Sequence, residues 1–197
     1  MASFKDAARR QSAPVESDRQ LFERVRAGDA AAFEVLFRSY AAPLCVFARG
    51  YVHTPDVAEE LVQDLFCWLW DHRSENAVPA SVKAYLFAAL RNRAINHLRR
   101  ERLSLDFKAS TAKQGSVTPL HRDADADLMA EDLSAALAVA IRTLPTRCRE
   151  VFSLVRDDHL TYVEVADVLG ISPKTVEIHM SRALASLREQ LAVWLAR

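Results

Sequence analysis

The sequence contains few of the residues on which many enzymes and metal-binding or secreted proteins depend. It has only 4 glycines, so it offers no glycine-rich loop that cradles a phosphate, and its 6 histidines include no pair at metal-ligand spacing. Cys45, Cys67 and Cys148 are odd in number, far apart and embedded in apolar helical patterns, so we predict three small buried hydrophobes and neither a disulfide framework nor a zinc site. No nucleophile and base stand out, so we expect no enzyme and no cofactor.

Charge and hydropathy narrow the possibilities further. The 26 basic residues balance the 26 acidic ones, so the chain as a whole has no field that would hold it on DNA, and DNA binding would depend on local patches or on a second protein. No uninterrupted apolar run approaches the roughly 20 residues that cross a bilayer, and the N-terminus lacks the apolar core of a signal peptide. We therefore expect a cytoplasmic protein of one or two small domains.

The most specific pattern lies near the C-terminus, where two short helices are joined by one tight turn. Thr161 and Glu164 have the spacing of a capping box, and Gly170 stands where the first helix ends and a positive φ is needed. Ser172 and Pro173 then begin a second helix. These features predict a helix-turn-helix, and an ordinary helical hairpin with the same caps is the alternative.

The second of these helices separates an apolar stripe from a mixed face. The inward positions at helical spacing are Val176, Met180, Ala183, Leu184 and Leu187. The outward positions combine hydrogen-bonding and apolar side chains, as in a helix that meets base edges in the major groove, whereas a merely solvated face is more often all charge. The predicted DNA-binding set is Lys174, Thr175, Glu177, Ile178, Ser181 and Arg182.

A second helix with a distinctive face is predicted from Pro55 to about Asp71, with Thr54 as its cap. Its apolar side is predicted to carry Val57, Leu61, Leu65, Trp68 and Leu69. The opposite side is predicted to carry Asp56, Glu59, Glu60, Gln63, Asp64 and Asp71, with Trp70 projecting among these acids. An acidic face is most simply a solvated surface, but an aromatic ring within it favours a partner with basic side chains.

The third distinctive helix, over roughly residues 81–100, has the opposite charge. Arginine occurs five times between residues 91 and 102, interleaved with amides. The inward positions are Leu86, Leu90, Ala94 and Leu98, and the far side holds Asn92, Asn96 and Arg99 flanked by Arg93 and Arg100, with Arg91 and Arg102 added to the cluster. Such a stripe can grip phosphates and hydrogen-bond bases, and a solvated basic helix end is the alternative.

The remaining segments divide the chain into two helical parts. We predict an all-α protein of two small helical domains joined by a flexible linker, with the helix-turn-helix in the second domain. In the second domain a helix over 128–143 is broken at Leu144-Pro145, and Thr146 is predicted to cap the next helix. The predicted division is a mobile tail at 1–17, a first domain at 18–102, a linker at 103–126 and a second domain at 127–197.

Taken together, these stretches resemble the extracytoplasmic-function (ECF) group of bacterial sigma-70 family sigma factors, over residues 18–102 and 128–195. The run DVAEELVQDLF from Asp56 is similar to the family's helix that binds core RNA polymerase, with Glu60 where an Asp is more usual. The run YLFAALRNRAINHLRR from Tyr85 resembles the helix that reads the promoter −10 element. The runs LP, LTY, ISPKTVE and SRAL, which begin at Leu144, Leu160, Ile171 and Ser181, resemble the domain that reads the −35 element.

The resemblance implies a mechanism and partners. The residues that would face the basic clamp of core RNA polymerase are Asp56, Glu59, Glu60, Gln63, Asp64 and Trp70. Those that would contact the −10 element are Asn92, Arg93, Asn96, Arg99 and Arg100. The helix-turn-helix set would contact the −35 element. The loop around residues 74–79 would capture a base flipped from the −10 strand, and no small-molecule substrate is implied.

The resemblance also implies a regulator. The sequence of residues 145–182 most resembles sigma factors of iron uptake and cell-surface signalling. This resemblance implies an anti-sigma partner in the membrane, which would hold the protein at the inner membrane. Two other classes stay open on the sequence alone: a conventional helix-turn-helix transcriptional regulator, and an interaction module that has lost DNA binding.

Overall fold

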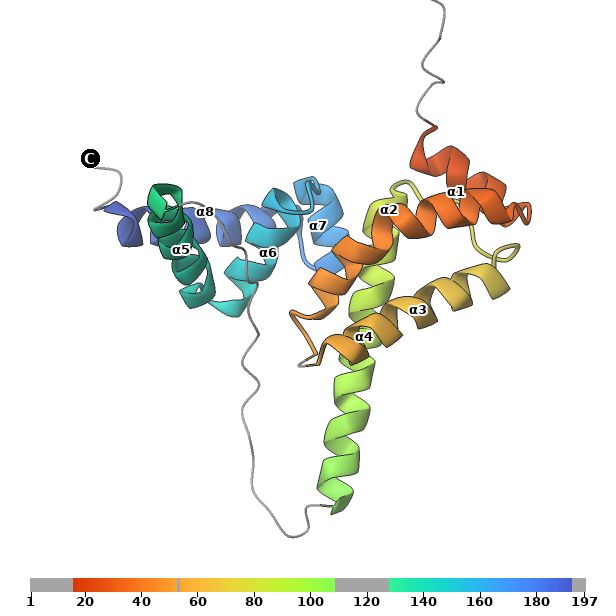
Figure 1. The fold of residues 1–197 in the computed structure, drawn as a ribbon, viewed down its shortest axis with the longest axis horizontal. Helices are drawn as coiled ribbons and strands as arrows, with labels where there is room; N and C mark the ends of the chain where they lie inside the picture. Colours follow the sequence, from red (N-terminus) through yellow and green to blue (C-terminus); the bar gives the residue numbers. More distant parts are fainter. Residues whose placement is uncertain (1–15, 53, 109–127, 193–197) are drawn as a thin grey trace, which may run out of the picture.

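The computed structural model describes residues 16–52, 54–108 and 128–192. These residues form eight α-helices and no strand, so the all-α prediction is confirmed (Figure 1). The helices are α1 (Asp18–Arg26), α2 (Ala30–Ala48), α3 (Pro55–Asp71), α4 (Val82–Lys108), α5 (Leu128–Thr143), α6 (Thr146–Arg156), α7 (Tyr162–Leu169) and α8 (Pro173–Gln190). The predicted tail, except for its last two residues, and most of the predicted linker lie outside the described residues.

Side-chain caps set several helix starts, because the first backbone N–H groups of a helix lack partners within it. Asp29 accepts hydrogen bonds from the N–H groups of the first turn of α2, and Thr161 and Ser172 cap α7 and α8 as predicted. Thr54 is the N-cap residue of α3 as predicted, although its side chain makes no capping hydrogen bond. The cap predicted at Thr146 is wrong, because α6 begins at Thr146 itself, after a proline that has no capping hydroxyl.

Helices α1 to α4 enclose a core rich in aromatic rings. Phe66 of α3 meets Phe33 and Phe37 of α2 edge to face, with ring centroids 6.0 and 4.9 Å apart, and Phe47 meets Phe87 of α4 at 5.0 Å. Such pairs contribute about 0.5 to 1.5 kcal/mol each beyond the burial of their area. These contacts join α2, α3 and α4 into one body and fix the orientation of their outward faces.

Helix α2 passes a simple length and composition test for crossing a membrane, the only helix in the described ranges to do so. It is nevertheless amphipathic, because it contributes a stripe to the core of this body, namely Ala32, Leu36, Tyr40, Leu44 and Ala48. Its exposed side includes Glu34 and Arg38, which form an ion pair at 2.6 Å. The pattern is that of a core helix, and Pro43 lies within it without ending it.

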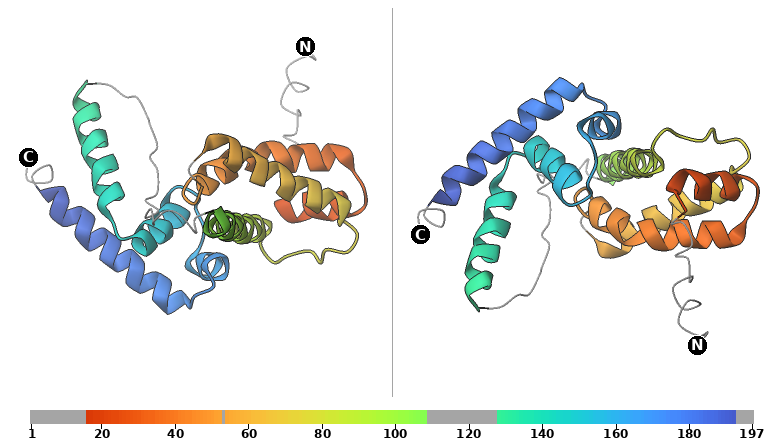
Figure 2. Two further views of the ribbon diagram at one scale, coloured as in Figure 1. Left: turned by 90° about the horizontal axis from the view of Figure 1, so that it is seen from below. Right: turned by 90° about the horizontal axis from the view of Figure 1, so that it is seen from above.

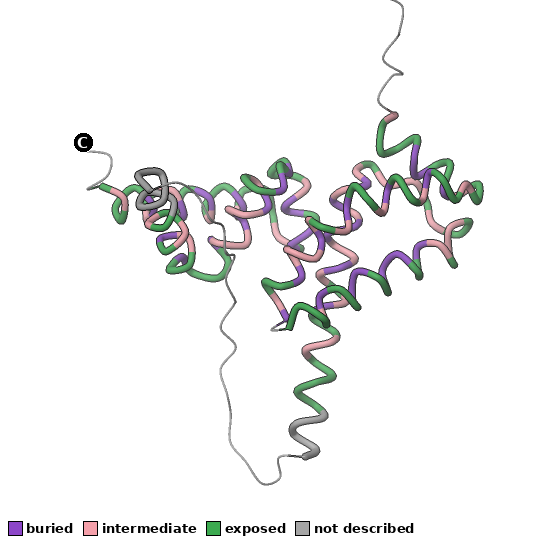
Figure 3. The backbone as a smooth tube through the Cα atoms, viewed as in Figure 1, coloured by how far each residue is buried: buried purple, intermediate pink, exposed green. Residues whose placement is uncertain are grey.

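Helix α4 is longer than the sequence predicted, since it runs to Lys108 instead of ending near Arg100. Residues 101–108 contain no glycine or proline that would stop a helix, and most have adequate helix propensity. Between Val82 and Leu103 the last buried residue is Ala94, and Leu103 is 60% exposed. The second half of α4 therefore projects from the body with a largely exposed surface (Figure 3).

Helices α5 to α8 form the second body. Its helix-turn-helix is confirmed: Gly170 ends α7 in the left-handed conformation, with φ 65° and ψ 41°, and Ala166 and Val176 are buried where α7 and α8 cross. Helix α5 packs on the far end of α8 through a small cluster that includes Ala140, Leu144, Cys148, Ala183 and Leu187.

The two bodies pack against each other along α4 and α7, with α1 to α3 on one side of α4 and α5 to α8 on the other (Figure 2). Apolar residues of α6 and α7, such as Leu154 and Val165, belong to the same core cluster as Leu86, Phe87 and Leu90 of α4. At the edge of this contact the Ser81 hydroxyl donates a 2.6 Å hydrogen bond to the Glu164 carboxylate.

Candidate nucleic-acid interface

The outward face of α8 has the composition that the sequence predicted. Lys174, Glu177, Ile178, Ser181 and Arg182 are exposed, and Ile178 keeps 42% of its surface open to solvent. The inward residues Val176, Met180, Ala183 and Leu187 are buried, while Leu184 is half-buried against the core. The turn and the two caps thus hold a mixed polar and apolar surface at the N-terminal half of α8, the part of a recognition helix that enters a major groove.

Three residues of this predicted set have internal partners. The Lys174 ammonium lies 2.7 Å from the Glu177 carboxylate, an exposed pair that contributes about 0 to 1 kcal/mol and breaks readily for a phosphate. Thr175 is half-buried, its N–H donates to the Ser172 hydroxyl at 3.1 Å, and the two hydroxyl oxygens lie 2.8 Å apart. Thr175 therefore serves the cap of α8 in this structure.

The stripe on α4 begins beside the body at Asn92 and continues along the half of the helix that projects from it. Asn92, Asn96, Arg99 and Arg100 are all exposed, so their amides and guanidinium groups are open to a ligand. Amides can pair with base edges, and arginines with phosphates or guanine.

Arg91, which the sequence predicted to be part of this exposed cluster, lies outside it. It is half-buried, its Nε is buried without a hydrogen-bond partner, and it lies near Tyr51, which Glu150 of α6 also faces. Burial raises the pKa of the Tyr51 hydroxyl well above its ordinary value; the Glu150 carboxylate adds to the rise and the Arg91 charge opposes it. Arg91 thus belongs to the contact between the two bodies.

The acidic face of α3 is exposed along its length. Asp56, Glu59, Glu60, Gln63, Asp64 and Asp71 all reach solvent, as predicted. The only ion pair among them in the described residues joins Glu59 to Arg49 at 3.6 Å, a long contact between two exposed groups. The face therefore keeps most of its negative charge for a partner.

The two tryptophans near the end of α3 are interchanged relative to the prediction. Trp70 does not project among the acids: it is half-buried, its ring lies 5.0 Å from that of Phe33, and the Arg73 guanidinium lies 4.6 Å above it. Trp68, predicted to face inward, is 36% exposed. The reason is the spacing of a helix, because Trp70 follows Phe66 by four residues and Trp68 follows Asp64 by four.

Trp68 therefore belongs to the acidic row and meets the basic helix. Its ring stacks on His72 with centroids 4.8 Å apart and an interplanar angle of 18°, and the Arg93 guanidinium of α4 lies 5.2 Å from its centroid. Burial lowers the pKa of the half-buried Arg93, and Tyr85 and Asp64 oppose that shift. Prediction from the sequence missed Trp68, although its four-residue spacing from Glu60 through Asp64 was a visible signal.

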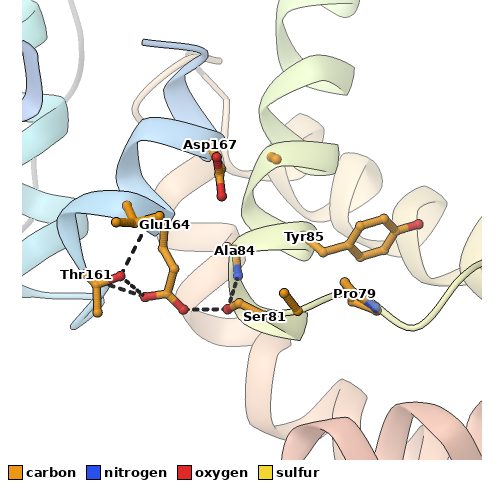
Figure 4. Close-up of a pocket in the computed structure, with 10 residues that line it drawn as sticks. Pro79, Ser81, Ala84, Tyr85, Thr161, Glu164 and Asp167 are labelled. Atoms are coloured by element: carbon orange, nitrogen blue, oxygen red, sulfur yellow. Dashed lines mark hydrogen bonds between the residues drawn. The ribbon is translucent and has the colours of Figure 1, made fainter. Parts of the chain in front are cut away.

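A cavity of about 420 Å³ opens where the two bodies meet. The start of α4, with the residues just before it, and α7 line the cavity; Glu164 lies between Thr161 and Ser81, with Pro79 and Tyr85 on the α4 side (Figure 4). Pro79 ends the loop at 74–79 to which the family resemblance assigns base capture, so that loop lies next to the contact between the two bodies.

Comparison with known proteins identifies the family. The model of sigma-70 region 2 matches residues 36–103, which hold most of α2 and all of α3 and the predicted −10 stripe, and the model of sigma-70 region 4 matches residues 134–187, which hold the helix-turn-helix. The chain belongs to the sigma-70 family of RNA polymerase sigma factors. Within it, the relatives below support membership of the ECF group.

The ECF sigma factor SigK of Mycolicibacterium vanbaalenii is 26% identical over 174 residues, which cover 88% of each chain. The ECF sigma factor SigW of Bacillus subtilis is 24% identical and covers 86% of this chain and 94% of its own. Among solved structures, the sigma factor RpoE of Bartonella quintana in complex with the anti-sigma factor NepR is 25% identical, with a TM-score of 0.61 over 82% of this chain and 97% of that one. CnrH, solved with the cytosolic domain of CnrY, shares the fold with a TM-score of 0.60 at 24% identity over 90% of this sigma factor and 99% of that chain.

Proposed function

We propose that this ECF sigma factor binds core RNA polymerase, directs it to specific promoters and assists melting of the −10 element. The observation that carries the proposal is that one chain exposes an acidic helix face on α3, an amide and arginine stripe on α4, and a mixed recognition face on α8. The first domain, residues 18–102, would hold the first two faces and the second domain, residues 127–197, the third.

The acidic face of α3 is the proposed polymerase contact. Asp56, Glu59, Glu60, Gln63 and Asp64 are exposed and largely without internal cations, so they are free to meet the basic clamp helices of the polymerase. Trp70 is left out of this surface because Phe33 and Arg73 cover it. The net charge of +0 suits this arrangement, since the polymerase would supply the remaining affinity for DNA.

Reversing Glu60 and Asp64 to Lys tests this contact. Both side chains are exposed, so the double variant should keep its helical circular dichroism, while like charges facing the clamp cost several kcal/mol and should abolish co-purification with core polymerase. The reversal of Glu23 and Glu34 to Lys, two exposed acids on α1 and α2, is the matched control and should leave co-purification intact. Undiminished binding of the folded Glu60 and Asp64 variant would contradict the assignment.

The amide and arginine stripe of α4, which runs from Asn92 onto the projecting half of the helix, is the proposed −10 reader. Asn92 and Asn96 would pair with bases of the melted strand, and Arg93, Arg99 and Arg100 would hold its phosphates. The recognition face of α8, made of Lys174, Glu177, Ile178, Ser181 and Arg182 with Thr175 at its cap, would enter the major groove of the −35 element.

The proposed role is non-catalytic, because the sigma factor would act by binding and by favouring the melted state of DNA. An anti-sigma factor is a further proposed partner, supported by the RpoE structure, which was solved with its anti-sigma factor NepR. We propose that the protein acts in the cytoplasm and that a membrane-bound anti-sigma partner holds it at the inner membrane.

Transcription with bacterial core polymerase tests the whole proposal. A promoter is first selected from a library with randomised −10 and −35 elements, and run-off transcription is then measured with core polymerase alone and with this protein added. A sigma factor gives transcripts only when both are present. A conventional helix-turn-helix regulator would bind DNA without core polymerase and would not start transcription, and an interaction module without DNA binding would do neither; either result would overturn the proposal.

A further inference from the structure

The seam between α3 and α4 brings an exposed tryptophan against an arginine of the predicted −10 stripe. Trp68 follows Asp64 on the polymerase-facing row of α3, yet its ring lies against Arg93 of α4, 5.2 Å from centroid to guanidinium carbon. The ring is also stacked on His72, whose Nδ1 lies 3.0 Å from the Trp68 carbonyl oxygen. Two planar groups thus already engage this indole, so it offers no free platform for a base and serves as a support.

Arg93 differs from the other arginines of the stripe because it is partly covered yet has its donors available. It is half-buried, whereas Arg99 and Arg100 are exposed. Within the described parts of the chain its guanidinium has no hydrogen-bond or ion-pair partner, and none of its nitrogens is buried, in contrast to Nε of the neighbouring Arg91. A guanidinium that lies over an aromatic ring and has no internal hydrogen-bond partner keeps its N–H donors for an acceptor that presents two oxygens together.

We infer that Trp68 is a positioning residue for Arg93, holding its guanidinium flat on the α3–α4 seam so that it can form a bidentate contact with a phosphate of the melted −10 strand. This inference rests on the proposed function of the α4 stripe. Because a free arginine side chain loses rotamer entropy when it binds, an arginine fixed by stacking loses less and binds more tightly. Helix α3 then contributes to both functions of the first domain, with Glu60 and Asp64 facing the polymerase and Trp68 acting on DNA through Arg93.

A double-mutant cycle of Trp68→Leu and Arg93→Ala tests the inference. The readouts are the affinity of the holoenzyme for a single-stranded oligonucleotide that carries the −10 sequence selected by the wild type, and the affinity of each variant for core polymerase. Because cation–π contacts of partly exposed groups are weak to moderate, Trp68→Leu should weaken oligonucleotide binding about three- to tenfold. Arg93→Ala should weaken it at least as much, and the double variant no more than Arg93→Ala alone, since Trp68 would act only through Arg93.

Three further variants separate this role from a structural one. Trp68→Phe keeps an aromatic face and should bind within about twofold of wild type. Arg93→Lys keeps the charge but not the planar fork, and should recover only part of the loss of Arg93→Ala. Val35→Ala removes an apolar side chain of α2 that is 48% exposed, more than the 36% of Trp68, and should change nothing. Core polymerase affinity should stay within about twofold throughout.

The outcomes are distinct. If Trp68→Leu and Arg93→Ala weaken oligonucleotide binding by independent factors that multiply, or if Trp68→Leu has no effect, Trp68 does not position Arg93. If Trp68→Leu weakens core polymerase binding as much as DNA binding, Trp68 belongs to the polymerase surface, and the inference is again overturned. A wild-type protein that fails to load the oligonucleotide onto core polymerase would refute the proposed function itself, which this experiment would show before any variant is compared.

Discussion

Removing the hydrogen bond between Ser81 and Glu164 tests whether the two bodies dock in solution as they do in the structure. Glu164 Oε1 accepts from the Ser81 hydroxyl at 2.6 Å, while Oε2 accepts from the N–H and hydroxyl of Thr161, each at 2.8 Å. One carboxylate thus completes the cap of its own helix and also binds the start of α4 across the domain contact (Figure 4). Ser81→Ala also removes the oxygen that accepts from the Ala84 N–H at 3.2 Å, so neither single substitution isolates the shared bond.

A double-mutant cycle isolates it. A hydrogen bond to a charged group contributes about 1.5 to 3 kcal/mol when well shielded, and this partly exposed one is expected near 1 to 1.5 kcal/mol. Each single alanine should lower the free energy of unfolding by about 1 to 3 kcal/mol, because a cap is lost as well. The double variant should lose about 1 to 1.5 kcal/mol less than the sum, since the shared bond is lost only once.

Urea unfolding followed by far-UV circular dichroism at pH 7 measures the four corners of the cycle. The matched control combines Ser81→Ala with Ser172→Ala, which removes the cap of α8. Because Ser172 bonds within its own helix start and not to Ser81, the losses of unfolding free energy from these two substitutions should add within about 0.3 to 0.5 kcal/mol. If the losses of unfolding free energy from Ser81→Ala and Glu164→Ala add as closely as those of the control pair, the bond does not exist in solution, and the docked arrangement is refuted.

The same carboxylate has a pH signature. Burial opposes ionisation of Glu164, but hydrogen bonds from Ser81 and Thr161 outweigh it and hold its pKa below the ordinary 4.5, with Lys83 adding to the shift and Tyr40 also facing the group. A carboxyl group whose pKa is lower when folded stabilises the fold above its unfolded pKa, and this stabilisation is lost as the pH falls through the folded value. Glu164→Gln should therefore lose less stability than wild type on acidification below about pH 4.5. Equal acid sensitivity of the two proteins would contradict this assignment.

Three further predictions concern the DNA-binding faces and the turn between α7 and α8. Alanine at Asn92 and Asn96 should reduce open-complex formation more than core polymerase binding, and unchanged permanganate reactivity of the −10 thymines would show that this face is not the reader. Lys174→Ala should weaken binding to most −35 sequences alike and make the affinity less dependent on salt, whereas Arg182→Ala should change the preferred bases, at about 1 to 3 kcal/mol per lost bidentate contact. A selection over randomised −35 elements with each variant distinguishes the two effects. Identical preferred sequences for both variants and the wild type would place specificity elsewhere. Gly170→Ala should lower the free energy of unfolding in urea by about 1 to 2 kcal/mol, because a residue with a Cβ is strained at a φ of 65°. The strain would come from the backbone alone, since no atom lies within 4 Å of the added Cβ. An unchanged free energy of unfolding would mean that the turn relaxes.

The helix-turn-helix was predictable because its signals are local. Thr161, Gly170 and Ser172 act through hydrogen bonds and backbone angles within a few residues, and the structure places all three as expected. The inward stripe of α8 and the bounds of α5 followed from periodicity for the same reason. Chemistry that acts over one helical turn can be found in a sequence without knowing the rest of the fold.

Prediction failed where packing between helices decides the outcome. Trp68 and Trp70 lie two residues apart on opposite sides of α3, and although helical spacing indicated the side of each ring, only the packing shows that Trp70 lies against Phe33 and that Arg93 of α4 lies over Trp68. Cys67, predicted to be buried, is exposed beside them for the same reason. The contact of Ser81 with Glu164 joins residues 83 positions apart in the sequence, and no local pattern records it.

The docked arrangement sets a condition on promoter recognition. Helix α4 with its 27 residues is only about 40 Å long, and its first turn is bonded to α7, the partner of the recognition helix, at 2.6 Å. The docked faces of α4 and α8 are therefore close together, and if the two proposed promoter elements lie farther apart than this along the DNA, the two bodies must separate to occupy both. Because buried apolar residues of both bodies share one core cluster, polymerase binding along α3 would have to outweigh the loss of this contact.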